Sequence, residues 1–79
     1  MSSTYKIICN GRVQGVGFRP YVSKLAKSMG LTGNVSNNEF GVVIFISGEA
    51  EHVTRFYKQL IENPPPVARI KSHEIIELD

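Results

Sequence analysis

The sequence predicts an α+β sandwich in which strands and helices follow one another in the order βαββαβ. Two segments, residues 18–29 and 50–60, carry apolar residues at helical spacing, which is the pattern of a helix that buries one face. Four further segments have the β-branched or alternating character of strands. These are residues 5–10, 31–37, 41–47 and 68–78. We therefore expect an antiparallel sheet with two helices packed on one face.

The strand segments differ in how strongly the sequence supports them. Residues 5–10 are apolar at every odd position, as expected for a strand with one buried face. Residues 41–47 are apolar on both alternating sets, so we expect this strand to lie centrally in the sheet. Gly33 and Asn34 weaken the strand expected in residues 31–37, because both residues are poor strand formers. The last segment alternates imperfectly.

Backbone chemistry marks the ends of the two helices. Pro20 fits the first turn of the first helix, where a missing N–H costs nothing, and Gly30 is the left-handed residue that ends many helices. Glu49 and Glu51 stand beside the start of the second helix, where the helix dipole favours anions. Three prolines at residues 64–66 forbid its continuation.

This order of elements, with two right-handed crossovers, predicts a ferredoxin-like fold of the broad α/β class, with residues 1–79 as a single domain. The fold serves metal chaperones, RNA-binding modules, regulatory domains and small hydrolases, so it does not define a function by itself. The function has to be argued from particular residues.

Composition argues against several classes of function. The formal net charge of +2 suits a small anion better than a long nucleic acid, so we expect no nucleic-acid partner. Cys9 is the single cysteine, which leaves no internal disulfide and no Cys-x-x-Cys pair and favours a cytoplasmic protein. His52 and His73 are isolated, so we expect no metal site and no cofactor. No apolar run is long enough for a membrane span, so we expect no membrane partner.

The segment between the first strand and the first helix is the candidate for chemistry. Gly11, where we expect the strand to end, and Gly15 and Gly17 allow left-handed backbone conformations that turn N–H groups inward, and a helix N-terminus follows. Arg19 stands at the start of that helix, where its planar guanidinium can grip two phosphate oxygens. Glycine spacing alone leaves an ordinary turn with a solvated arginine equally open. The segment lacks both the Walker A and the dinucleotide-binding motifs.

Residues 11–19 resemble the acylphosphatase signature, Gly-x-Val-Gln-Gly-Val-x-Phe-Arg, at every fixed position. Residues 33–37, followed after three residues by Gly41, are similar to the second motif of that family, in which an asparagine ends the second strand and a glycine opens the third. The family usually has an aromatic residue where this chain has Asn34, a difference that concerns local packing rather than chemistry. The resemblance covers nearly the whole chain.

Within that family, three segments resemble most the N-terminal acylphosphatase domains of the HypF carbamoyltransferases of [NiFe]-hydrogenase maturation. They are residues 17–22 (Gly-Phe-Arg-Pro-Tyr-Val), 25–26 (Leu-Ala) and 65–70 (Pro-Pro-Val-Ala-Arg-Ile). Members of the family usually continue into a short C-terminal strand, whereas this sequence stops after its fourth strand. We therefore expect a domain cut from, or related to, a longer protein, with the other domains of that protein as partners.

The resemblance implies a hydrolase that splits a small-molecule acyl phosphate, with carbamoyl phosphate among the candidates, into a carboxylate and inorganic phosphate. It implies that Arg19 and the backbone N–H groups of the loop bind the phosphoryl group, and that phosphate or sulfate binds as product or inhibitor. The loop residues are Val13, Gln14, Gly15, Val16, Gly17 and Phe18. It also implies that Asn37 orients the attacking water. Without the resemblance, Asn37 reads as a turn residue, and Asn38, which has no counterpart in the motif, is expected to be replaceable with little effect.

Three alternatives compare differently with the sequence, and the metal chaperone among them can be set aside. An RNA-binding module would display aromatic side chains on its central strands, where this chain offers Phe45. A metal chaperone would need a thiol pair in the first loop, which the sequence lacks. A phosphate-binding N-terminal domain of a HypF-type carbamoyltransferase would share the site and act only within the larger enzyme.

Overall fold

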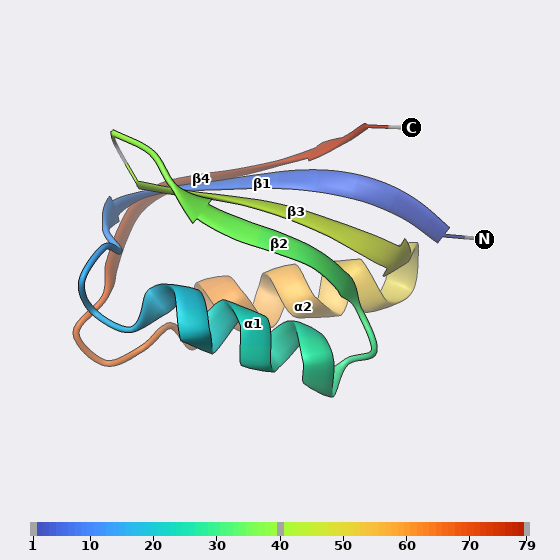
Figure 1. The fold of residues 1–79 in the computed structure, drawn as a ribbon, viewed down its shortest axis with the longest axis horizontal. Helices are drawn as coiled ribbons and strands as arrows, with labels where there is room; N and C mark the ends of the chain where they lie inside the picture. Colours follow the sequence, from blue (N-terminus) through green and yellow to red (C-terminus); the bar gives the residue numbers. More distant parts are fainter. Residues whose placement is uncertain (1, 40, 79) are drawn as a thin grey trace.

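The computed structural model describes residues 2–39 and 41–78 and has the βαββαβ order that the sequence predicts (Figure 1). The elements are β1 (Ser2–Arg12), α1 (Phe18–Ser28), β2 (Thr32–Asn37), β3 (Gly41–Glu49), α2 (Ala50–Glu62) and β4 (Arg69–Glu77). The expectation that Gly11 ends the first strand is wrong, because β1 continues past an irregularity in its pairing with β4 between Asn10 and Gly11. A Cβ atom at Gly11 would lie 2.3 Å from the carbonyl oxygen of Arg69, so the close strand approach requires glycine.

The four strands form one sheet in the order β2-β3-β1-β4, with antiparallel pairing between all neighbours. β3 therefore lies inside the sheet, as its two apolar faces predict. Both helices cover the same face of the sheet, and the other face carries no helix (Figure 1). This is the ferredoxin-like arrangement expected from the sequence.

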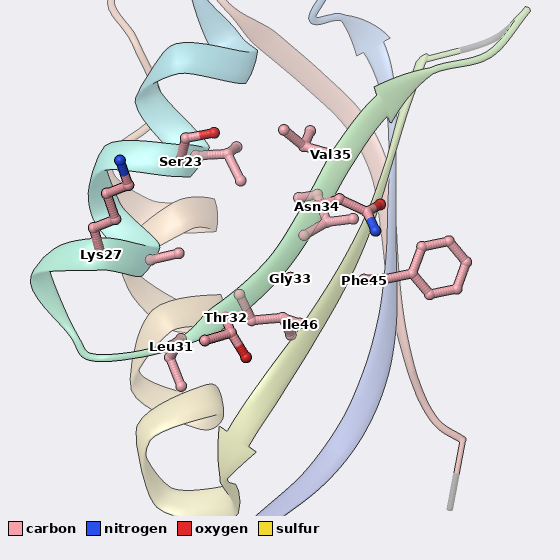
Figure 2. Close-up of a pocket in the computed structure, with 12 residues that line it drawn as sticks. Ser23, Lys27, Leu31, Thr32, Gly33, Asn34, Val35, Phe45 and Ile46 are labelled. Atoms are coloured by element: carbon pink, nitrogen blue, oxygen red, sulfur yellow. The ribbon is translucent and has the colours of Figure 1, made fainter.

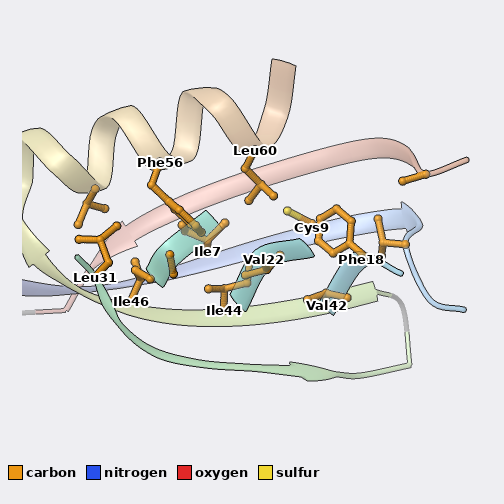
Figure 3. Packing of buried hydrophobic residues seen from close by; sticks show 14 residues of the cluster. Ile7, Cys9, Phe18, Val22, Leu31, Val42, Ile44, Ile46, Phe56 and Leu60 are labelled. Carbon is orange, nitrogen blue, oxygen red and sulfur yellow. The ribbon is translucent and has the colours of Figure 1, made fainter. Parts of the chain in front are cut away.

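The hydrophobic core lies between the sheet and the two helices (Figure 3). Ile7 of β1 pairs with Ile44 of β3, and both side chains point toward the helices and are almost fully buried. Each helix contributes one buried stripe. The stripe residues are Phe18, Val22 and Ala26 in α1 and Val53, Phe56 and Leu60 in α2. The core therefore fixes the start of α1 through Phe18, one residue before Arg19.

The glycine-rich loop and the β2–β3 turn lie at the same end of the sheet (Figure 1). Asn10, near the end of β1, pairs with Gly41 at the start of β3. Asn37, the last residue of β2, pairs with Val42 of β3. The fold thus brings the glycine-rich loop close to the β2–β3 turn, although α1 and β2 lie between them in the sequence.

Candidate active site

The loop of residues 13–17 is anchored at both ends by buried side chains. Val13 and Phe18 are each 1% exposed, so the backbone between them is held against the core. Gly15 and Gly17 have φ values of 73° and 78°, in the left-handed region where residues with a Cβ atom are strained. A Cβ atom would meet nothing within 4 Å at either glycine, so backbone conformation rather than lack of space requires them. The signature glycines therefore shape the path of the loop.

The N-terminus of α1 is available to an anion. Gly17 is the N-cap residue, and no side chain of the described residues caps the helix by a hydrogen bond. The first turn of α1 contains no acidic residue. The N–H groups of Phe18 and Arg19 therefore point out of the helix start with no capping side chain as acceptor. Pro20 supplies no N–H, so the loop has to provide the other backbone donors.

Arg19 stands exposed in the first turn of α1. Within residues 2–39 and 41–78, its guanidinium makes no hydrogen bond or ion pair with another side chain. The five N–H donors of the guanidinium are therefore free to bind a ligand from the side of the loop. This placement is compatible with the predicted role of Arg19 in binding a phosphoryl group.

Asn37 lies on the helix-facing side of β2, because its partner Val42 points toward the core. Its exposed side chain lines a cavity whose other lining residues come from the loop and the first turn of α1. The cavity has a volume of about 220 Å³. Its lining residues are Val13, Gln14, Gly15, Gly17, Phe18, Arg19, Pro20 and Asn37. We call this cavity the cradle.

The cradle gathers all but one of the predicted site residues. The exception is Val16, which does not line it and whose half-buried side chain packs against the core. Sequence reasoning gave the side chain of Gln14 no role, yet its Nε2 atom donates hydrogen bonds to the carbonyl oxygens of Asn38 (2.5 Å) and Gly41 (2.9 Å). Gln14 thus ties the loop to the β2–β3 turn and leaves its backbone N–H for a ligand. The glutamine inside a glycine-rich loop, where a small residue would serve a simple turn, is the signal that could have indicated this contact.

The β2–β3 turn is itself fixed by Asn38. The side-chain oxygen of Asn38 accepts a hydrogen bond of 2.7 Å from the N–H of Gly41, and the N–H of Asn38 donates to the carbonyl oxygen of Gly41 at 2.9 Å. This is the local side-chain-to-backbone bonding that asparagine makes in turns. We therefore expect replacement of Asn38 to disturb the turn, in contrast to the nearly silent substitution expected from the sequence.

The remaining candidate residues lie away from the cradle. Cys9 is fully buried, and burial raises the pKa of its thiol to about 11, so it is protonated at neutral pH. His73 lies near α2, where its Nδ1 atom is 2.5 Å from the hydroxyl oxygen of Tyr57. No group of three or more His, Cys, Asp or Glu residues in the described part of the chain could hold a metal ion. In the same part, no helix is both long enough and apolar enough to span a membrane.

Phe45 lies on the face of the sheet that carries no helix. It pairs with Lys6 of β1, whose Nζ atom lies 6.0 Å from the centre of the ring. Tyr5 pairs with Ile46 and points toward the helices instead. Among the described residues of β1 and β3, Phe45 is therefore the one aromatic side chain on the open face. RNA-binding modules of this fold stack two or three bases on aromatic side chains of the sheet, and a single ring does not provide such a surface.

Comparison with known proteins identifies related chains. The acylphosphatase family model matches residues 5–79. An acylphosphatase of Staphylococcus aureus (strain Newman) is 36% identical over 69 residues, which cover 87% of this chain and 78% of the relative. The carbamoyltransferase HypF of Synechocystis is 38% identical over 78 residues, which cover 99% of this chain and 10% of the relative. The chain thus spans about a tenth of the length of that carbamoyltransferase.

A solved structure supports the same relationship. The crystal structure of full-length HypF in a phosphate- and nucleotide-bound form superposes with a TM-score of 0.96 at 35% sequence identity. The match covers 100% of this chain and 10% of that one. The ferredoxin-like backbone described above is therefore shared by a domain of that larger protein.

Proposed function

The chain belongs to the acylphosphatase family, and we propose that this hydrolase domain splits acyl phosphates in the cradle, with Arg19 and the loop as phosphoryl-binding groups and Asn37 as the water-positioning group. The observation that carries the proposal is the convergence of these groups on one cavity of about 220 Å³. The loop and Arg19 reach the cavity from one side and Asn37 from the end of β2. Arg19 and Asn37 come from two motifs of the sequence that are separated by a whole helix.

The phosphoryl-binding half of the site acts through fixed donors. Hydrolysis of an acyl phosphate spreads negative charge over the phosphoryl oxygens and the departing carboxylate. The backbone N–H groups of residues 13–18 are held by the core and by left-handed glycines, so they need little reorganisation as that charge develops. Arg19 adds its positive charge from the first turn of α1. Preorganised donors of this kind supply the largest part of the rate enhancement in many hydrolases.

Water attacks directly in this mechanism. The residues that line the cradle include no Ser, Thr, Cys, His, Asp or Glu, so its described lining offers neither a covalent nucleophile nor a strong base. The amide of Asn37 can hold a water molecule by hydrogen bonds and orient it for attack on phosphorus. The phosphorus–oxygen bond to the carboxyl group breaks, and the products are a carboxylate and inorganic phosphate. Acyl phosphates are activated enough for positioning and charge stabilisation to suffice.

The test uses the purified chain with benzoyl phosphate as substrate and inorganic phosphate or sulfate as inhibitor. We expect turnover above the uncatalysed rate and competitive inhibition by both anions, because the cradle recognises a tetrahedral anion. A folded protein that binds phosphate but does not turn over benzoyl phosphate would retain a binding role only. A folded protein without either property would refute the proposal.

A HypF-type context is the second candidate, favoured by the match that covers 99% of this chain and a tenth of the relative. In that case the domain would handle carbamoyl phosphate as the N-terminal part of a longer carbamoyltransferase. Sequencing the gene beyond Asp79 tests this reading, because a continuation with paired cysteines supports it and a stop codon contradicts it. We further propose that residues 1–79 form a single domain without a nucleic-acid partner, which the single core and the weak net charge of +2 support. The single cysteine, Cys9, favours a cytoplasmic location.

A further inference from the structure

A second hollow lies between α1 and β2 (Figure 2). Its volume is about 310 Å³. The floor consists of buried apolar side chains, and Ser23 of α1 and Val35 of β2 stand on either side of it (Figure 2). The floor residues are Val22, Ala26, Ile44 and Ile46. We call this hollow the α1–β2 groove.

The groove and the cradle have no lining residue in common, but they are neighbours along both α1 and β2. On α1, Arg19 lines the cradle and Val22 lines the groove, and residues three apart on a helix are neighbours about 4.5 Å apart along its axis. On β2, Asn37 lines the cradle and Val35 lines the groove. Both residues point toward the helices, because they pair with Val42 and Ile44. A molecule held between Arg19 and Asn37 therefore has the groove directly beside it.

We propose that the α1–β2 groove receives the acyl group of the substrate whose phosphoryl group the cradle binds, and that it selects apolar acyl groups over the carbamoyl group. This inference rests on the proposed hydrolysis of acyl phosphates. It assigns the chemical class of the substrate, for which the cradle itself carries no information.

The chemistry of the floor favours an aromatic or branched aliphatic acyl group. Val22 and Ile44 are 2% and 1% exposed, so an acyl group above them meets a packed apolar surface. Burying the apolar surface of a ring there is worth on the order of tenfold or more in affinity. A carbamoyl group carries an NH₂ that needs hydrogen-bond acceptors, and the floor side chains have none. The polar lining residues Ser23, Lys27 and Thr32 do not belong to the floor, so the floor itself gives carbamoyl phosphate no advantage.

A blocking variant tests the groove. Ser23→Phe places a ring beside the floor, and Lys24→Phe is the matched control, because Lys24 is an exposed neighbour on the same helix that does not line the groove. We expect Ser23→Phe to lower kcat/KM for benzoyl phosphate about tenfold, with acetyl and carbamoyl phosphate changed less than about twofold. Lys24→Phe should leave all three values near those of the unmodified chain. An equal loss with all three substrates in Ser23→Phe would overturn the proposal.

Binding of unreactive analogues separates this proposal from the proposed activity. NMR titration of the unmodified chain compares benzylphosphonate with methylphosphonate. We expect both to shift loop amides and benzylphosphonate alone to shift the amides of Ala26 and Val35. Shifts in the groove without turnover of any acyl phosphate would sustain the groove and refute the hydrolysis. Turnover with equal shifts for both phosphonates would sustain the hydrolysis and refute the groove.

Discussion

The cradle and the core meet at residues 18 and 19, yet different interactions determine the structure of each. Phe18 is 1% exposed and packs into the core, whereas the next residue, Arg19, is exposed and faces the cavity. The core is a set of interlocking apolar side chains, so its free energy depends on volume and burial. The cradle depends on left-handed glycines, an uncapped helix start and exposed polar side chains.

Stability and activity should therefore be separable in this small domain. A substitution in the core should lower the free energy of unfolding and leave the chemistry of the remaining folded molecules intact. A substitution in the cradle should do the reverse, since exposed polar groups contribute little to stability. Single substitutions in the core and in the cradle can test this separation.

Phe56→Ala should have the largest effect, and it should be on stability. Phe56 of α2 is fully buried in the core, so truncation leaves a cavity and is expected to cost about 3–5 kcal/mol. Urea denaturation measures the loss. Because a domain of this size has on the order of 5–10 kcal/mol of stability, part of the protein should be unfolded without denaturant near the lower limit.

Phe45→Ala is the matched control for Phe56→Ala. Phe45 is only half-buried on the open face of the sheet, so the same substitution should cost less than about 2 kcal/mol. Both variants should keep the kcat of the unmodified chain once corrected for the folded fraction. A loss of kcat in folded Phe56→Ala would show that core and cradle are coupled.

Arg19→Lys should lower kcat/KM for benzoyl phosphate on the order of a thousandfold, although the positive charge is kept. An ammonium group cannot reproduce the planar, bidentate grip of the guanidinium. The melting temperature should hardly change, because the guanidinium of Arg19 is exposed and free of ion pairs with the described residues. Arg55→Lys is the control, since Arg55 forms an exposed ion pair of 4.0 Å with Glu51 in α2 and should be neutral in both assays. A near-normal rate for Arg19→Lys would remove Arg19 from the site.

Asn37→Ala should lower kcat on the order of a hundredfold while the Kd of inorganic phosphate stays nearly unchanged. The amide positions water in the transition state, whereas Arg19 and the loop hold the anion in the ground state as well. Asn34→Ala replaces Asn38 as the control, because the side chain of Asn34 lies on the opposite face of β2 and Asn38 is needed by the turn. An unchanged kcat with a loss of about 1 kcal/mol in stability would make Asn37 a turn residue only.

The fold was predictable because its signals are local. Helical spacing, prolines and glycines marked both helices, and the double apolar character of β3 located it inside the sheet. The extension of β1 past Gly11 was not predictable, because it depends on the close approach of Arg69 from the far end of the chain. Such contacts between distant residues leave no trace in the local pattern.

The candidate site was predictable in composition but not in its supporting bonds. The signature motifs predict roles for Arg19 and Asn37, and the fold brings both residues to one cavity. The same motifs could not distinguish the loop residues that line the cavity from Val16, whose side chain packs on the core. The motifs also could not show that the Gln14 side chain donates hydrogen bonds to the β2–β3 turn. Its acceptors, Asn38 and Gly41, lie 24 and 27 positions further along the sequence.

Among the substitutions in the cradle, Gln14→Met should have the smallest effect on kcat. We expect this effect to arise indirectly, through a change in the position of Asn37. Methionine keeps the length of the side chain and removes the two hydrogen bonds to the turn, which are worth about 1 kcal/mol each at most in this exposed position. We expect kcat to fall tenfold or less, with the phosphate Kd nearly unchanged, because the backbone N–H of Gln14 remains. Gln59→Met, at an exposed position of α2, is the matched control and should be silent.

The double variant Gln14→Met/Asn37→Ala decides how Gln14 acts. If Gln14 acts only by holding the turn that positions Asn37, Gln14→Met should have no further effect on kcat in a variant that already lacks the amide of Asn37. The double variant should then have the kcat of Asn37→Ala alone, a coupling of about 1 kcal/mol in the cycle. Additive losses in kcat would show instead that the side chain of Gln14 acts on the phosphoryl group directly. The loop would then contribute a side chain to catalysis as well as its backbone N–H groups.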